Sequence, residues 1–243
     1  MRESETGSVE YADMEPDDFS RYVEYAYRYD YTVPSCGLDD RVTKEEVLEE
    51  EARLAEERLE TARLEEAIPE TPVLFSSKSQ KRKAKMLSAS ITPRTNFVRR
   101  NSVTRNEPKA SMLDNFEPQG NNSPEQDFTL VFLAHARLYT FAYMRLIDPL
   151  KRLALHKLHK TLLGFQLYKR RIGDVIELAR YAYGTGEDRK EDGTIEDLRK
   201  LVMEYMACAV STFGKHDDFV SLLEEGGEFV GDFWRTVVKE GLL

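Results

Sequence analysis

The stretch FLAHARLYTFAYMRLIDPLKRLALHKLHKTL, residues 132–162, contains much of the richest apolar run in the chain and decides the fold. Its apolar residues recur at helical spacing on both sides of Asp148 and Pro149, a pair that suits the start of a helix. The spacing predicts helices over about 127–145 and 149–163. Similar patterns follow over about 168–182, 194–213, 217–225 and 227–239, with Gly or Pro at most junctions. Because short loops make neighbouring helices antiparallel, residues 127–243 are predicted to form a compact all-α bundle.

The composition limits what the rest of the chain can do. The 243 residues are 33% charged and 41% hydrophobic, with a formal net charge of -9. These values argue against one core built from the whole length and against a whole-chain nucleic-acid binder, which would normally be basic. Cys36 and Cys208 lie far apart, the start is acidic, and no apolar run is long enough to span a bilayer. We expect an intracellular protein, of the nucleus or the cytoplasm, with no membrane partner.

Residues 1–35 contain a short aromatic helix. GSVEYA can form a strand, and Pro16 with two aspartates then favours a helix start. Helical spacing places Phe19, Tyr22, Val23, Ala26 and Tyr27 on one apolar face. We expect this face to pack against another part of the chain.

Two charged segments separate this helix from the bundle. Within residues 36–68, the stretch from Lys44 to Ala67 predicts an acidic helix with a thin apolar stripe; a solitary solvated helix fits it better than a coiled coil. Residues 69–126 are rich in Ser, Asn, Pro and basic residues. Because so little apolar surface cannot offset the cost of ordering the chain, we expect this insert to be disordered.

No pattern of an enzyme or a metal protein is complete in this sequence. His156 and His159 stand three apart, so both could reach one helix face as metal ligands do, but no third ligand accompanies them. The alternative is a helix with a core stripe of Leu153, Leu155, Leu158 and Leu162 and a basic outer face. Nucleophile elbows and phosphate-binding loops are missing. We expect no enzyme activity, no cofactor and no metal.

The basic insert offers two short motifs. KSQKRKAK, with Lys81, Arg82, Lys83 and Lys85, could be a nuclear import signal, because a flexible cationic run can meet an acidic receptor groove without a fold. RRNSV places Ser102 two residues after an arginine pair, the pattern that basophilic kinases prefer. Phosphorylation there would add about two negative charges to a basic segment.

The order of features resembles a known family. GSVEYADMEPDDFSRYVEYAYRYDYTVP is similar to the last strand and following helix of a BTB (POZ) domain, with Tyr29 where the family usually has glycine in the exit turn. Residues 132–162 resemble the segment that follows BTB domains in many fungal proteins, and the later helices resemble the C-terminal, BACK-like extension of the same proteins. The matching positions are Leu138, Tyr139, Phe141, Ala142, Leu150, Leu153, Ala154, Lys157 and Leu158. The elements that make up the first two thirds of a BTB domain have no counterpart in this chain.

The resemblance implies a non-enzymatic protein-interaction module, an adaptor or scaffold that is linked to ubiquitin ligases in the intact family. Its partners would be proteins, with BTB-type self-association and a cullin as the two candidates that the family suggests. The residues expected to join the two segments in one core are Phe19, Tyr22, Val23, Tyr27, Leu138, Tyr139, Leu150, Leu153 and Leu158. The alternative is a nuclear, chromatin-associated factor that uses the basic insert 78–105. A metal enzyme built on His156 and His159 is the third hypothesis.

Overall fold

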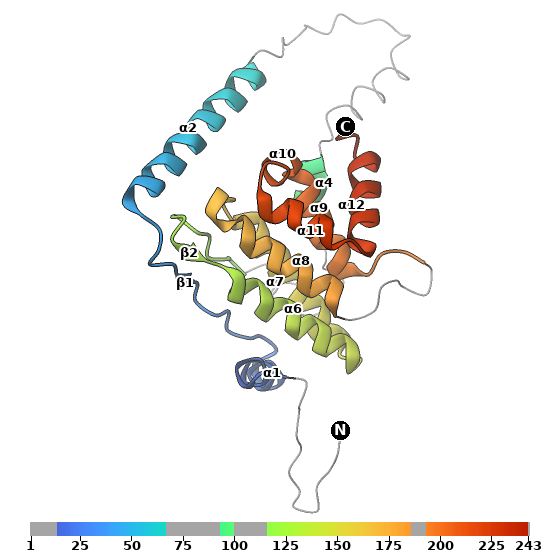
Figure 1. Ribbon diagram of the computed structural model, residues 1–243. Coiled ribbons are helices and arrows are strands. Elements are labelled where there is room, and N and C mark those ends of the chain that lie inside the picture. The colour runs from blue at the N-terminus through green and yellow to red at the C-terminus, as the bar shows by residue number, and fades with distance from the viewer. Residues whose placement is uncertain (1–13, 67–92, 100–115, 186–192, 243) are drawn as a thin grey trace, which may run out of the picture.

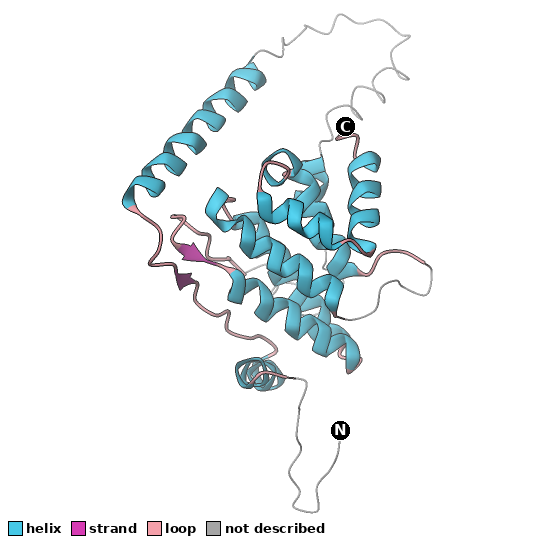
Figure 2. Cartoon of the chain, viewed as in Figure 1, coloured by secondary structure: helices cyan, strands magenta, loops and turns pink. Residues whose placement is uncertain are grey.

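The structure, a computed structural model, describes residues 14–66, 93–99, 116–185 and 193–242. These residues form a mainly helical molecule with ten α-helices and one two-stranded sheet (Figures 1 and 2). Among the described helices, none combines the length and the apolar character that a membrane crossing requires. The expected strand GSVEYA lies outside the described residues.

Helices α6 (Thr129–Met144) and α7 (Asp148–Gly164) form the central pair of the bundle. The turn between them places Leu146 in the left-handed conformation, with φ 57°. The amides of Leu146 and Ile147 then donate to the carbonyls of Tyr143 and Ala142, which satisfies the end of α6. This tight reversal lays α7 against α6. Asp148 begins α7 but makes no capping bond through its side chain, in contrast to the pattern that Asp148 and Pro149 suggest.

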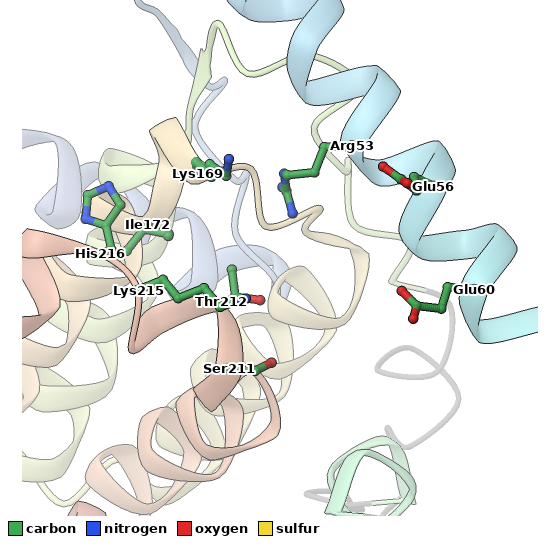
Figure 3. Close-up of a pocket in the computed structure, with 9 residues that line it drawn as sticks. All are labelled: Arg53, Glu56, Glu60, Lys169, Ile172, Ser211, Thr212, Lys215 and His216. Atoms are coloured by element: carbon green, nitrogen blue, oxygen red, sulfur yellow. The ribbon is translucent and has the colours of Figure 1, made fainter. Parts of the chain in front are cut away.

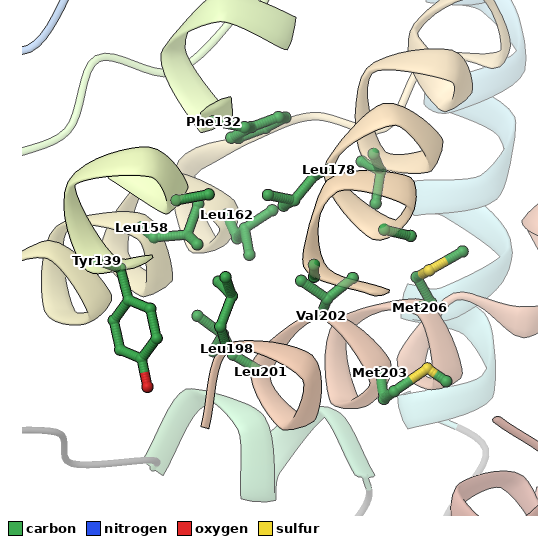
Figure 4. Packing of buried hydrophobic residues seen from close by; sticks show 14 of the residues in the cluster. Phe132, Tyr139, Leu158, Leu162, Leu178, Leu198, Leu201, Val202, Met203 and Met206 are labelled. Carbon is green, nitrogen blue, oxygen red and sulfur yellow. The ribbon is translucent and has the colours of Figure 1, made fainter. Parts of the chain in front are cut away.

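Helix α8 (Ile172–Gly184), which follows the 3-10 turn η1 (Lys169–Arg171), and helix α9 (Asp197–Cys208) complete the core. Figure 4 shows leucines of α7 meeting Leu178 of α8 and Leu198, Leu201 and Val202 of α9. Each fully buried leucine contributes roughly 1.5–3 kcal/mol, so this cluster supplies much of the stability. Three further helices close the bundle: α10 (Val210–Phe213), α11 (Asp217–Glu225) and α12 (Glu228–Lys239). The helical patterns read from the sequence correspond closely to these elements.

The N-terminal part lies on the outside of the bundle. Helix α1 (Pro16–Arg28) packs beside α6, and helix α2 (Lys44–Glu66) extends away from the body (Figure 1). Between them, strand β1 (Gly37–Leu38) pairs antiparallel with β2 (Gln126–Asp127), which stands directly before α6. Helix α2 is mostly exposed, as a solvated helix should be, but Glu50 is buried and accepts a hydrogen bond from the amide of Lys169.

Within residues 69–126, which we expected to be disordered, the structure describes two segments. Pro93–Arg99 forms helix α4, which packs against α9 with Phe97 buried. Residues 116–125 also have a defined path, because the side chain of Asn121 exchanges two hydrogen bonds with the backbone of Gln166. The buried ring of Phe97 thus holds the first segment and the side-chain amide of Asn121 holds the second, although both segments are otherwise polar. Lys81, Arg82, Lys83, Lys85 and Ser102 lie outside the described residues.

Candidate interaction site

The residues at the two ends of helix α1 explain where the helix begins and ends. Pro16 occupies the first turn, where its missing N–H costs nothing, and Asp17 and Asp18 favour the positive end of the helix dipole. At the other end, Tyr29 adopts φ 58° and its amide donates to the carbonyl of Tyr25 at 2.7 Å. This is the left-handed conformation that glycine adopts most easily, and it turns the chain back toward the bundle.

The inner face of α1 is not the face that the sequence pattern predicts. Tyr25 and Asp18 are buried, and the ring of Tyr22 lies 5.0 Å from that of Phe141 on α6. Burial raises the pKa of Asp18, although Arg21, which binds it at 2.7 Å, opposes the shift. Aromatic packing and the ion pair between Asp18 and Arg137 of α6, at 3.7 Å, thus attach α1 to α6.

The outer face of α1 carries the residues that we expected inside. Tyr27 is 84% exposed, Phe19 is 39% exposed and Val23 is half-buried. The expectation that Phe19 and Tyr27 belong to the core is therefore wrong, since the helix has aromatic residues on both faces and Tyr25 takes the inner one. Of the other residues expected in the core, Tyr22 is partly buried, and the structure buries Leu138, Tyr139, Leu150, Leu153 and Leu158.

A buried lysine of α7 binds the segment that follows α1. The ammonium of Lys157 on α7 donates to the carbonyl of Tyr31 at 2.6 Å, forms an ion pair with Asp30 at 2.5 Å, and lies over the rings of Tyr31 and Phe116. Its side chain is 3% exposed, and burial lowers its pKa. The expected basic outer face of α7 is wrong at this position, because the segment after α1 covers it.

The hydroxyl of Tyr31 extends this contact to a buried histidine. It lies 2.7 Å from Nδ1 of His135 on α6, and Thr161 lies 3.4 Å from Nε2 of the same ring. The hydroxyl of Thr161 donates to the carbonyl of Lys157, so Thr161 can only accept at the ring. His135 is therefore neutral with its hydrogen on Nε2, and Tyr31 donates to Nδ1. We name Asp30, Tyr31, His135 and Lys157 the latch.

A second buried ion cluster holds the sheet to the bundle. Arg171 binds Asp39 at 2.7 Å, beside Asp174 at 3.7 Å, and Asp174 accepts a hydrogen bond from the amide of Phe128. Burial raises the pKa of Asp174 to about 7, while hydrogen bonds from Arg41 and Arg171 hold the pKa of Asp39 well below its usual value. The pair β1–β2 is thus anchored on both sides.

Glu196 caps the first turn of α9. Its carboxylate accepts hydrogen bonds from the amides of Leu198 and Arg199. The same carboxylate accepts a hydrogen bond from the hydroxyl of Tyr139. Tyr139 therefore joins α6 to α9 as well as filling the core.

A groove of mixed charge lies between α2 and the bundle (Figure 3). Its volume is about 380 Å³. Arg53, Glu56 and Glu60 line it from α2, opposite Lys169 and Lys215. His216, on the same wall, accepts a hydrogen bond from the amide of Asp218 and so caps α11. Carboxylates and ammonium groups face each other here, and Ile172, Ser211 and Thr212 complete the lining.

The two histidines that could have bound a metal lie inside the bundle. His156 and His159 are both buried, and Nε2 of His159 lies 2.9 Å from the carbonyl of Phe97 on α4. Since a carbonyl only accepts, this nitrogen carries a hydrogen and is not available to a metal. Within the described part of the chain, no three His, Cys, Asp or Glu side chains are placed together as metal ligands.

No protein family, curated protein or solved structure matches this chain. The latch is the part of the site that sequence patterns did not single out as a unit, because its four residues come from three separate segments. Lys157 and Tyr31, which ends the exit turn, are the members that the resemblance had marked. A buried Lys with a nearby Asp and an aromatic segment gives no periodic signal, so only the fold brings them together.

Proposed function

We propose that this protein is a non-enzymatic interaction adaptor or scaffold of BTB type, in which the bundle holds α1 so that its outer face can bind a protein partner. The order of segments that resemble the end of a BTB domain and its helical extension supports this proposal. So does Tyr29, which adopts a glycine-like conformation at the position where that family usually has glycine.

The observation that carries the proposal is the contact between the two resembling segments. Lys157, from the helical extension, binds the carbonyl of Tyr31, from the exit of the aromatic helix. Tyr22 and Phe141 join the same two segments through their rings. The two segments therefore form one unit, and α1 cannot use its inner face for a partner without breaking it.

The outer face of α1 has the properties of a recognition surface. Tyr27 is 84% exposed on a helix that is fixed by burial on its other side. Aromatic residues on a rigid support are the common anchors of protein interfaces, because little conformational freedom is lost when they are covered. Asp17 lies in the first turn and Arg28 in the last.

This distribution of charge suits a second copy of the chain. When two α1 helices lie antiparallel across a two-fold axis, the acidic turn of each meets Arg28 of the other. A helix of 13 residues offers a small contact, so we expect a weak dimer, with a Kd roughly micromolar or above. Self-association is thus the form of BTB-type assembly that we favour over cullin binding.

The test compares two exposed aromatic residues on different helices. Sedimentation of the full chain over a concentration series should show reversible dimers for the wild type and for Trp234→Asp on α12, where Trp234 is 58% exposed. The Tyr27→Asp chain should remain monomeric with an unchanged circular dichroism spectrum. A wild type that is monomeric throughout, or equal dissociation by both variants, would refute pairing through α1.

The alternative, a nuclear factor that uses residues 78–105, stays a prediction. Its described portion is α4, where Arg94 and Arg99 are exposed. Binding of DNA with a steep salt dependence, lost when residues 78–105 are deleted, would support this alternative.

A further inference from the structure

Helix α4 is an isolated element within the basic insert. Along the chain, its nearest described neighbours are Glu66 and Phe116. It has 7 residues, too few for a stable helix in water without tertiary contacts. Its helical form therefore depends on the surface of α7 and α9 against which it lies.

One side chain provides the main contact. The ring of Phe97 is 4% exposed and stands edge-on to the imidazole of His159, with centroids 4.8 Å apart. On the other side it lies 5.6 Å from the ring of Tyr205 on α9. The carbonyl of Phe97 accepts a hydrogen bond from His159, while Val98, the next residue, is 52% exposed. Helices that bind in grooves do so through buried apolar side chains, and Phe97 is such a side chain on α4.

Charge supports the same arrangement. The segment Pro93–Arg99 contains two arginines and no acidic residue. Arg94 lies near Cys208, at the carboxyl end of α9, where the helix dipole favours a cation. Burial raises the pKa of Cys208 to about 11, Arg94 lowers it, and Glu240 and Glu204 raise it further. Arg94 and two glutamates, Glu240 and Glu204, therefore all lie close enough to Cys208 to act on its thiol.

Helix α4 covers part of the bundle. Helices α7 and α9 contact each other directly, and Phe97 of α4 belongs to the same buried hydrophobic cluster as their leucines. Removal of α4 would uncover the rings of His159 and Tyr205, which Phe97 contacts.

We propose that the groove between α7 and α9 is a binding site for short basic helices with a phenylalanine anchor, and that α4 occupies it as an internal, displaceable ligand. A protein partner with such a helix competes with α4 and gains access when α4 leaves. This site uses none of the residues of the outer face of α1, so it is independent of the proposed self-association.

The probe is a labelled peptide with the sequence of residues 91–101, titrated with the full chain and followed by fluorescence anisotropy. An internal ligand at an effective concentration of roughly millimolar weakens binding of a competitor. We therefore expect the peptide to bind the Phe97→Asp chain at least about tenfold more tightly than the wild type. The Val98→Asp chain should behave as the wild type, and a peptide with Phe97→Ala should bind poorly.

Equal binding of the peptide to the wild-type and Phe97→Asp chains would overturn the proposal. The proposal also fails if the Phe97→Asp chain has the circular dichroism of the wild type but does not bind the peptide. If Phe97→Asp unfolds the bundle, hydrogen exchange of the wild-type chain tests the proposal instead. Saturating peptide should then speed exchange in residues 93–99 and leave α7 protected. Exchange in α4 that does not change with peptide would show that α4 is a fixed part of the fold.

Discussion

Acidification should weaken the latch through His135. The ring is fully buried, accepts from the hydroxyl of Tyr31 at Nδ1, and has no room for a second proton without leaving that hydroxyl unsatisfied. Burial, together with repulsion from Lys157 and Arg21, lowers its pKa from 6.5 to about 3. The folded protein therefore keeps His135 neutral where the unfolded chain would protonate it.

The sign and size of the effect follow from this difference. A lowered pKa in the folded state means that the stabilisation is fully present above the unfolded pKa of 6.5 and is lost as pH falls toward about 3. At about pH 5, protonation favours the unfolded chain by roughly thirtyfold, which corresponds to about 2 kcal/mol. Other titrating groups add to the total change, so a matched variant is needed to isolate this one.

His135→Asn provides that variant, since its side-chain oxygen can replace Nδ1 as the acceptor for Tyr31 but does not titrate. Urea unfolding followed by circular dichroism, at about pH 8 and about pH 5, gives the free energy of unfolding for both chains. The wild type should lose about 2 kcal/mol more than His135→Asn between the two conditions. Equal losses would show that His135 is not held neutral by the fold.

Two further predictions use the same unfolding measurement, and a third uses hydrogen exchange. Burial raises the pKa of Asp174 to about 7. Protonation of Asp174 therefore stabilises the folded protein fully below about pH 4, and this stabilisation is lost as pH rises through about 7. On going from about pH 5 to about pH 8, Asp174→Asn should lose less stability than the wild type. Gly120→Ala should cost about 1–3 kcal/mol, since its Cβ would lie 2.5 Å from the carbonyl oxygen of Gly164, whereas Gly184→Ala should cost little. Tyr22→Asp should release α1 from the bundle, which hydrogen exchange would report as faster exchange in α1. Tyr27→Asp should leave the exchange of α1 unchanged. Equal exchange of α1 in the two variants would contradict the packing of Tyr22 on Phe141.

The bundle could be predicted from the sequence because its helices repeat apolar residues along one face. Leu150, Leu153 and Leu158 follow this period and are buried. The same period fails for Lys157 and His159, which we expected on an exposed basic face. They are buried because the segment after α1 and helix α4 cover them, and these contacts join residues 126 and 62 positions apart in the chain. Local spacing carries no information about such distant partners.

The aromatic helix shows a second limit of periodicity. Phe19, Val23 and Tyr27 share one face, and Tyr22 and Tyr25 share another, so two apolar faces compete for the bundle. The buried face also contains Asp18, which forms ion pairs with Arg21 and with Arg137 of α6. Similarly, Phe97 is a single apolar anchor in a polar segment, and composition alone favours disorder there.

The pairing of β1 with β2 makes residues 39–125 an excursion whose two ends lie at the same point. The amide of Asp39 donates to the carbonyl of Glu125 at 2.8 Å, so the two ends of the excursion lie side by side. A loop whose ends are already joined can lengthen at low cost, since each doubling adds only about 0.6 kcal/mol of closure entropy. The acidic α2 and the basic α4 both lie on this excursion, so the chain can gain, lose or exchange such segments while the bundle keeps its fold.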